Sequence, residues 1–101
     1  MQQIDPQALA ALDDAVIVDV REEYEWNDAH VAGAHLVPLS LLANGGAELP
    51  AARPLYIMCH SGGRSARVTA ALEEDGIEAI DVAGGITAWI AAGLPVERGA
   101  A

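Results

Sequence analysis

Short apolar runs alternate along the chain with stretches in which apolar residues recur at helical spacing. The apolar runs, which we predict to form β-strands, are residues 15–20, 34–39, 54–58 and 77–82. The stretches that we predict to form α-helices are residues 7–12, 22–28, 41–46, 65–75 and 86–92. This alternation predicts an α/β fold, in which a mostly parallel sheet has helices on both faces. The run 54–58 is expected near the centre of that sheet.

Several residues mark where the predicted helices begin and end. Asp5 and Pro6 fit an N-cap followed by proline at the first helical position. Gly76 fits the C-cap of the helix that precedes it. We expect the two bulky side chains of the second helix, Tyr24 and Trp26, to lie in the core rather than at an interface.

The composition predicts one domain that covers residues 1–101, because 101 residues with 52% hydrophobic content suffice for one modest core. The net charge of −10 argues against nucleic acid and anionic membranes as partners. No apolar run approaches the roughly 20 residues of a membrane span, and the N-terminus does not resemble a signal peptide. A single cysteine forms no internal disulfide, so we expect a reducing, cytoplasmic location.

The basic residues are few and unevenly placed. All five are arginines, and three of them lie between positions 53 and 67. The chain contains no lysine and no phenylalanine while alanine is abundant, which we interpret as the composition of a bacterial protein from a GC-rich genome. Positive charge is therefore concentrated around the one cysteine, Cys59.

The surroundings of Cys59 are those expected of a nucleophilic thiol. An apolar run ends at Cys59, a turn with Gly62 and Gly63 follows, and Arg64 stands directly before the clearest predicted helix. Ligands in parallel α/β folds bind beyond the carboxyl ends of the strands. Glycines allow positive φ and close backbone approach, so several N–H groups can converge on a thiolate or a bound oxyanion near a helix N-terminus. The alternative is a buried cysteine that serves as a small hydrophobic residue.

The polar residues near Cys59 admit more than one role. The Arg64 guanidinium can pair with an acidic side chain of the scaffold or hold an anionic substrate oxygen. Asp19, at the end of another strand, can bind loop backbone or an arginine, or act as a simple cap. For His60 we expect the backbone N–H to matter more than the imidazole, because adjacent residues leaving a strand point apart.

A metal site is not expected. His30 and His35 do not have the spacing of zinc ligands, and the chain has no second cysteine. A covalent intermediate on Cys59 would therefore pass to an external acceptor, since no second thiol is present to resolve it.

Three blocks of the sequence together resemble the rhodanese (sulfurtransferase) family over nearly the whole chain. The first runs from Val18-Asp19-Val20-Arg21-Glu22 to His30-Val31-Ala32-Gly33-Ala34. The second, Cys59-His60-Ser61-Gly62-Gly63-Arg64-Ser65, is similar to the active-site loop of that family. The third combines Val82-Ala83-Gly84-Gly85-Ile86 with Trp89 and Gly93-Leu94-Pro95-Val96.

The resemblance implies a single-domain rhodanese of bacterial type with a mostly parallel five-stranded sheet and no cofactor. It implies that Cys59 attacks the outer sulfur of thiosulfate, a polysulfide or a persulfide, and that the resulting Cys59 persulfide passes its sulfur to cyanide, a thiol or an acceptor protein. The implied binding residues are His60, Ser61, Gly62, Gly63 and Arg64. The implied supporting residues are Asp19 and Ser65.

Two alternatives remain beside sulfur transfer. The same fold resembles that of dual-specificity cell-cycle phosphatases and rhodanese-like arsenate reductases. Those phosphatases have five residues between cysteine and arginine where this chain has four, and the shorter loop suits sulfur better than phosphate. The second alternative is a non-catalytic interaction module or a sulfur carrier dedicated to one partner protein, for which the acidic surface would suit a basic partner.

Overall fold

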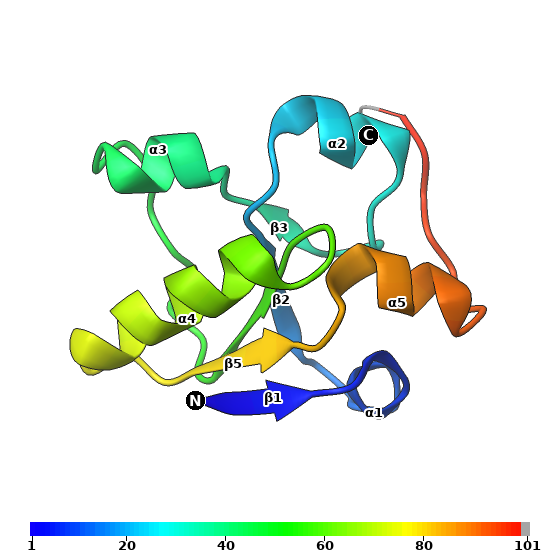
Figure 1. The fold of residues 1–101 in the computed structure, drawn as a ribbon, viewed down its shortest axis with the longest axis horizontal. Helices are drawn as coiled ribbons and strands as arrows, with labels where there is room; N and C mark the ends of the chain where they lie inside the picture. The colour runs from blue at the N-terminus through cyan, green and yellow to red at the C-terminus, as the bar shows by residue number, and fades with distance from the viewer. Residues whose placement is uncertain (100–101) are drawn as a thin grey trace.

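The structure, a computed structural model, describes residues 1–99. Its centre is a sheet of five parallel strands in the order β1-β5-β4-β2-β3 (Figure 1). The strands are β1 (Gln2–Ile4), β2 (Val16–Asp19), β3 (His35–Leu36), β4 (Leu55–Met58) and β5 (Ala79–Val82). The predicted α/β class with a five-stranded sheet is confirmed, and β4 occupies its middle as expected.

Five helices pack around this sheet (Figure 1). They are α1 (Pro6–Ala10), α2 (Glu23–Asp28), α3 (Leu39–Ala43), α4 (Gly63–Glu74) and α5 (Gly85–Ala91). The Asp5 carboxylate accepts the Ala8 N–H at 2.9 Å, which is the predicted cap of α1. Across residues 1–99, no helix is both long enough and apolar enough to cross a membrane.

Two apolar clusters cover opposite faces of the sheet, because neighbouring strand residues point to opposite sides. On one face, Ile57 of β4 packs in a cluster that includes Val68 and Leu72 of α4. On the other face, Met58 packs in a cluster with Trp89 of α5. Helices therefore flank both faces of the sheet, and Leu55, Ile57 and Met58 of β4 are fully buried between them.

The first strand was not predicted from the hydrophobic pattern. β1 pairs with β5 at the edge of the sheet, with Gln2 opposite Ile80 and Ile4 opposite Val82. Its Gln2 and Gln3 are exposed, so the segment lacks the apolar run that marks the inner strands. The pattern for 34–39 predicted too long a strand, since only His35 and Leu36 pair with β2.

The expected burial of Tyr24 is wrong. Its side chain is 76% exposed, whereas Trp26 is half-buried and stacks on the His30 ring with a centroid distance of 3.9 Å. The helix α2 is short and has no fully buried residue, so only one side of it contacts the rest of the protein. The exposed Tyr24 side chain therefore lies in solvent rather than in the core, close to Glu25 and His60.

Candidate active site

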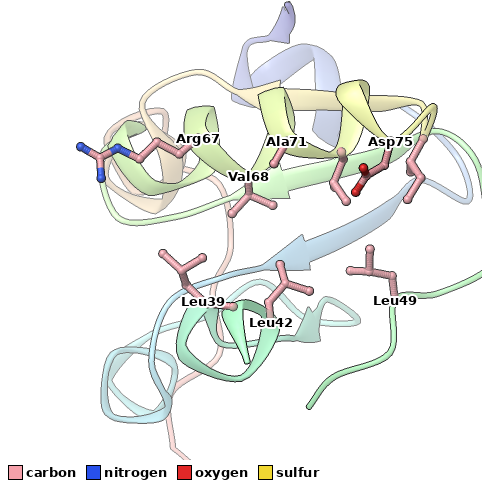
Figure 2. A pocket seen from close by; sticks show the side chains of 10 residues that line it. Leu39, Leu42, Leu49, Arg67, Val68, Ala71 and Asp75 are labelled. Atoms are coloured by element: carbon pink, nitrogen blue, oxygen red, sulfur yellow. The ribbon is translucent and has the colours of Figure 1, made fainter. Parts of the chain in front are cut away.

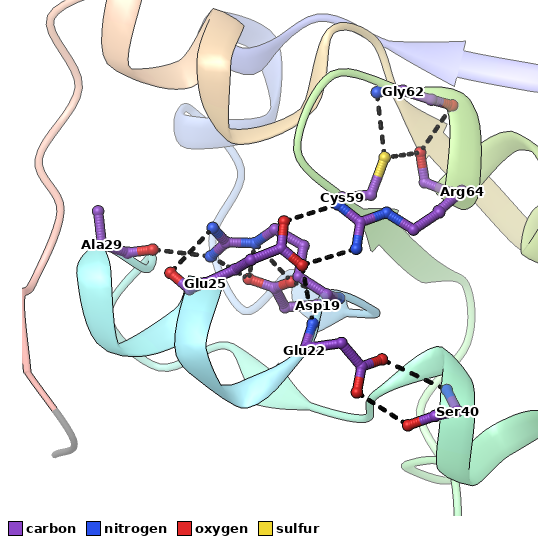
Figure 3. A network of polar contacts seen from close by, with 10 residues as sticks. Asp19, Glu22, Glu25, Ala29, Ser40, Cys59, Gly62 and Arg64 are labelled. Carbon is purple, nitrogen blue, oxygen red and sulfur yellow. Dashed lines mark hydrogen bonds and ion pairs between the residues drawn. The ribbon is translucent and has the colours of Figure 1, made fainter.

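The Cys59 thiol lies at the end of the central strand, beneath the first turn of α4 (Figure 3). The residue is only 1% exposed. The Gly62 N–H donates to Cys59 Sγ at 3.0 Å, and the Ser65 hydroxyl lies 3.3 Å from the same sulfur. A backbone donor and the N-terminal end of a twelve-residue helix therefore both favour negative charge at this position.

The two loop glycines have different roles. Gly62 has φ of +116°, a conformation that other residues rarely adopt, and it is the N-cap of α4. Gly63 does not have positive φ and is already the first residue of the helix. The prediction that both glycines provide unusual backbone geometry therefore applies to Gly62 alone.

Arg64 binds the scaffold through both ends of its guanidinium fork. Nη1 donates to Glu25 Oε1 at 2.6 Å and Nη2 donates to Glu25 Oε2 at 2.7 Å (Figure 3). Hydrogen bonding between these two side chains lowers the pKa of Glu25 from its usual 4.5 to about 2 and raises the pKa of Arg64. Of the two roles considered for Arg64, pairing with an acidic side chain is the one observed, and contact with a donor molecule stays a prediction.

The Glu25–Arg64 pair predicts a specific loss of stability in acid. A carboxylate whose pKa is lower in the folded state stabilises that state above about 4.5, and the stabilisation is lost as the pH falls towards 2. Because the Arg64 side chain is 34% exposed, we expect Glu25→Gln to cost only about 2 kcal/mol at pH 7 and almost nothing at pH 2. Urea unfolding at both pH values measures this difference. Glu23→Gln, an exposed neighbour in α2, is the matched control, and equal losses in both variants would contradict the assignment.

Asp19 holds Arg21 rather than the cysteine loop. Its carboxylate accepts the Arg21 backbone N–H at 3.0 Å and the Arg21 Nη2 at 2.8 Å, and both residues are buried. Arg21 Nη2 also donates to the Ala29 carbonyl at 2.7 Å, so the ion pair ties the end of β2 to the end of α2. Among the roles considered, Asp19 binds an arginine, and its support of the site is indirect because α2 carries Glu25.

The backbone of the cysteine loop is held by a second helix that sequence reasoning did not connect with it. The Ile86 N–H donates to the Cys59 carbonyl at 2.8 Å, and the Thr87 N–H donates to the His60 carbonyl at 3.0 Å. A methyl group on Gly85 would lie 2.3 Å from the Cys59 carbonyl oxygen. The Gly84-Gly85 motif was visible in the sequence, and its close contact with the loop accounts for the absence of a side chain at Gly85.

A buried carboxylate behind the loop was also not anticipated. Asp81 of β5 is 1% exposed, and its Oδ1 accepts the Ser65 hydroxyl at 2.5 Å. Its Oδ2 accepts the amide of Gln3 at 2.8 Å. A hydrogen-bonded chain therefore runs from Cys59 through Ser65 and Asp81 to Gln3 in β1.

His60 and Ser61 are exposed at the outer side of the loop. A cavity of about 350 Å³ lies beside His60 and is lined also by Arg21, Tyr24, Glu25 and Asp28. A separate apolar cavity of about 430 Å³ opens between α3 and α4, where Leu39 and Leu42 face Val68 (Figure 2). No residue from 59 to 64 lines this second cavity.

Within residues 1–99, no three His, Cys, Asp or Glu residues lie close enough to hold a metal ion.

Residues 5–92 match the family model of the Rhodanese-like domain. A protein of Mycobacterium tuberculosis described as a probable adenylyltransferase/sulfurtransferase is 41% identical over 76 residues, which are 72% of this chain and 19% of that protein. A sulfurtransferase of Allochromatium vinosum is 34% identical, covering 89% of this chain and 85% of its own length. The crystal structure of a rhodanese-related protein from Thermoplasma volcanium superposes with a TM-score of 0.87 at 30% identity, covering 96% of this chain and 98% of that one.

Proposed function

Because this chain belongs to the family of rhodanese-like domains, we propose that it is a sulfurtransferase in which Cys59 carries the sulfur as a persulfide. The observation that supports this most directly is the position of Cys59 Sγ, 3.0 Å from the Gly62 N–H at the N-terminus of α4. Backbone N–H groups and a helix N-terminus stabilise a sulfur anion without a metal or cofactor. The N-terminus of α4 also favours the persulfide, whose negative charge lies on its outer sulfur.

The proposed reaction has two displacement steps. The Cys59 thiolate attacks the outer sulfur of thiosulfate, a polysulfide or a low-molecular-weight persulfide. The S–S bond of the donor breaks, and sulfite or a thiolate leaves with the electron pair of that bond. An acceptor thiolate or cyanide then attacks the outer sulfur of the Cys59 persulfide and regenerates the Cys59 thiolate.

The residues around the thiol are proposed to have distinct parts in this reaction. The exposed loop residues His60 and Ser61 face the approaching donor, while Gly62 supplies the N–H that binds the sulfur. Gly63 is the first residue of α4, and Arg64 anchors the first turn of that helix through Glu25. The acceptor is a small thiol, cyanide or a partner protein, and we propose a cytoplasmic setting in which such thiols are reduced.

Intact mass spectrometry tests this proposal directly. Protein exposed to thiosulfate, and separately to glutathione persulfide, is expected to gain one sulfur atom that cyanide or glutathione removes. Protein whose Cys59 has first been alkylated with iodoacetamide is the control and is expected to gain none. If neither donor loads the protein, sulfur transfer from small donors is excluded. Sulfur that loads but leaves for neither acceptor would instead favour a carrier dedicated to one partner protein.

A further inference from the structure

Asp81 is a buried carboxylate that the proposed displacement chemistry does not use. It is 1% exposed, and the two groups that hydrogen-bond to it, the Ser65 hydroxyl and the Gln3 amide, are both uncharged. Burying a carboxylate without a cationic partner is unfavourable, so its presence directly behind the cysteine loop calls for a reason. The position of Ser65 between Asp81 and Cys59 supplies one.

The Ser65 hydroxyl has one proton and three neighbours that can accept it. They are Asp81 Oδ1 at 2.5 Å, the Gly62 carbonyl at 3.2 Å and Cys59 Sγ at 3.3 Å. The carboxylate oxygen at the shortest distance is the strongest of these acceptors. The Ser65 proton therefore points towards Asp81, and Ser65 presents only lone pairs to the sulfur. Cys59 fits this arrangement as an S–H donor to Ser65 Oγ.

We propose that Asp81, acting through Ser65, holds the unloaded Cys59 in its thiol form and so favours the persulfide over the bare thiolate, an inference that rests on the proposed sulfur transfer. A bare thiolate would place its charge on Sγ, against the lone pairs of Ser65 and near the Asp81 charge. In the persulfide, Sγ is a neutral bridging atom, and the negative charge lies on the outer sulfur, about 2 Å further along the S–S bond. Asp81 is thus a positioning residue that disfavours the Cys59 thiolate more than the Cys59 persulfide.

The other charged groups around the thiol do not replace Asp81 in this role. On α4 and α2, Arg64 and Glu25 neutralise each other, and at the end of β2, Arg21 and Asp19 do the same. His60 is exposed on the outer side of the loop. The Gly62 N–H and the N-terminus of α4 favour an anion on the sulfur, so Asp81 and Ser65 oppose them selectively at Sγ.

The pH dependence of Cys59 alkylation by iodoacetamide tests the effect on the thiol. Asp81→Asn keeps the shape of the side chain and removes its charge. The variant is expected to react about tenfold faster at pH 7, which corresponds to a shift of about one pH unit in the midpoint of the rate profile. The rate at high pH, where every molecule is a thiolate, is expected to stay unchanged. A general loosening of the loop would instead raise the rate at all pH values.

The ratio of persulfide to thiol tests the preference for the loaded form. At a fixed ratio of glutathione persulfide to glutathione, Asp81→Asn is expected to carry about tenfold less persulfide relative to free thiol than the wild type. Asp75→Asn, at the exposed far end of α4, is expected to match the wild type in both assays. Ser65→Ala, which removes the acceptor of the thiol proton, is expected to shift the alkylation midpoint in the same direction as Asp81→Asn, and it serves if that variant does not fold.

Unchanged or slower alkylation of Asp81→Asn and Ser65→Ala at pH 7 would overturn the inference, as would an unchanged ratio of persulfide to thiol. The alkylation assay needs no sulfur donor. Failure of the wild type to load sulfur would therefore reject the proposed function, while the alkylation profiles would still decide whether Asp81 controls the thiol.

Discussion

The Cys59→Ser protein is expected to gain no detectable sulfur from thiosulfate or from glutathione persulfide, and to transfer none to cyanide. Near neutral pH a serine hydroxyl is far less ionised and less nucleophilic than a thiol, so the first displacement does not start. The chain has no other cysteine that could hold a persulfide in its place. Intact mass after exposure to each donor, together with thiocyanate formation from cyanide, measures the loss.

The same variant is expected to fold normally, with a free energy of unfolding within about 1 kcal/mol of the wild type. A serine oxygen can accept the Gly62 N–H that now donates to sulfur, and it can still hydrogen-bond with Ser65. Urea unfolding therefore separates lost chemistry from lost structure. Sulfur uptake by Cys59→Ser would show that the sulfur is held elsewhere and would remove Cys59 from the mechanism.

Gly85→Ala is expected to lower the free energy of unfolding by about 3 kcal/mol and to slow sulfur loading at least tenfold. The added methyl group would lie 2.3 Å from the Cys59 carbonyl oxygen and 2.8 Å from that of His60. Both obstacles are backbone atoms, which cannot rotate away as a flexible side chain can. The start of α5 must then separate from the loop, which breaks the hydrogen bonds from Ile86 and Thr87 and displaces the sulfur.

Gly93→Ala is the matched control for this prediction. Gly93 also has positive φ, +75° against +57° for Gly85, but a methyl group there would meet no atom within 4 Å. This control is expected to lose only about 1 kcal/mol, the backbone strain of alanine in that conformation, and to load sulfur at the wild-type rate. Urea unfolding and the rate of mass gain should both be measured on the pair. Equal losses in the two variants would mean that the contact between α5 and the loop contributes little.

The position of the thiol was predictable because it depends on local pattern. A β-branched or apolar run followed by glycines and a helix places Cys59 at the end of a strand, and the structure has it at the end of β4. The partners of the loop were not predictable in this way. Glu25 lies 39 residues before Arg64, and Asp81 lies 16 residues after Ser65. Nothing in the sequence indicates which of fifteen acidic residues meets which polar group, because only the packing of the strands brings them together.

The errors in the fold have similar physical causes. β1 was missed because an edge strand needs few apolar residues, and its identity depends on pairing with β5, at the other end of the chain. Tyr24 was assigned to the core by its size, but α2 is too short to bury more than one side. In both cases the surroundings of a segment, and not its composition, decide its structure.

The closed pairing of Arg64 with Glu25 also bears on how fast donors reach the thiol. With that guanidinium neutralised, no fixed positive charge of the loop offsets the overall charge of −10, and a dianion such as thiosulfate approaches against repulsion. Dissolved salt screens this repulsion over about 10 Å at 0.1 M ionic strength, while encounters with uncharged donors are hardly affected. Under the proposed sulfur transfer, we therefore expect the ionic strength of the solution to influence which donor loads the thiol.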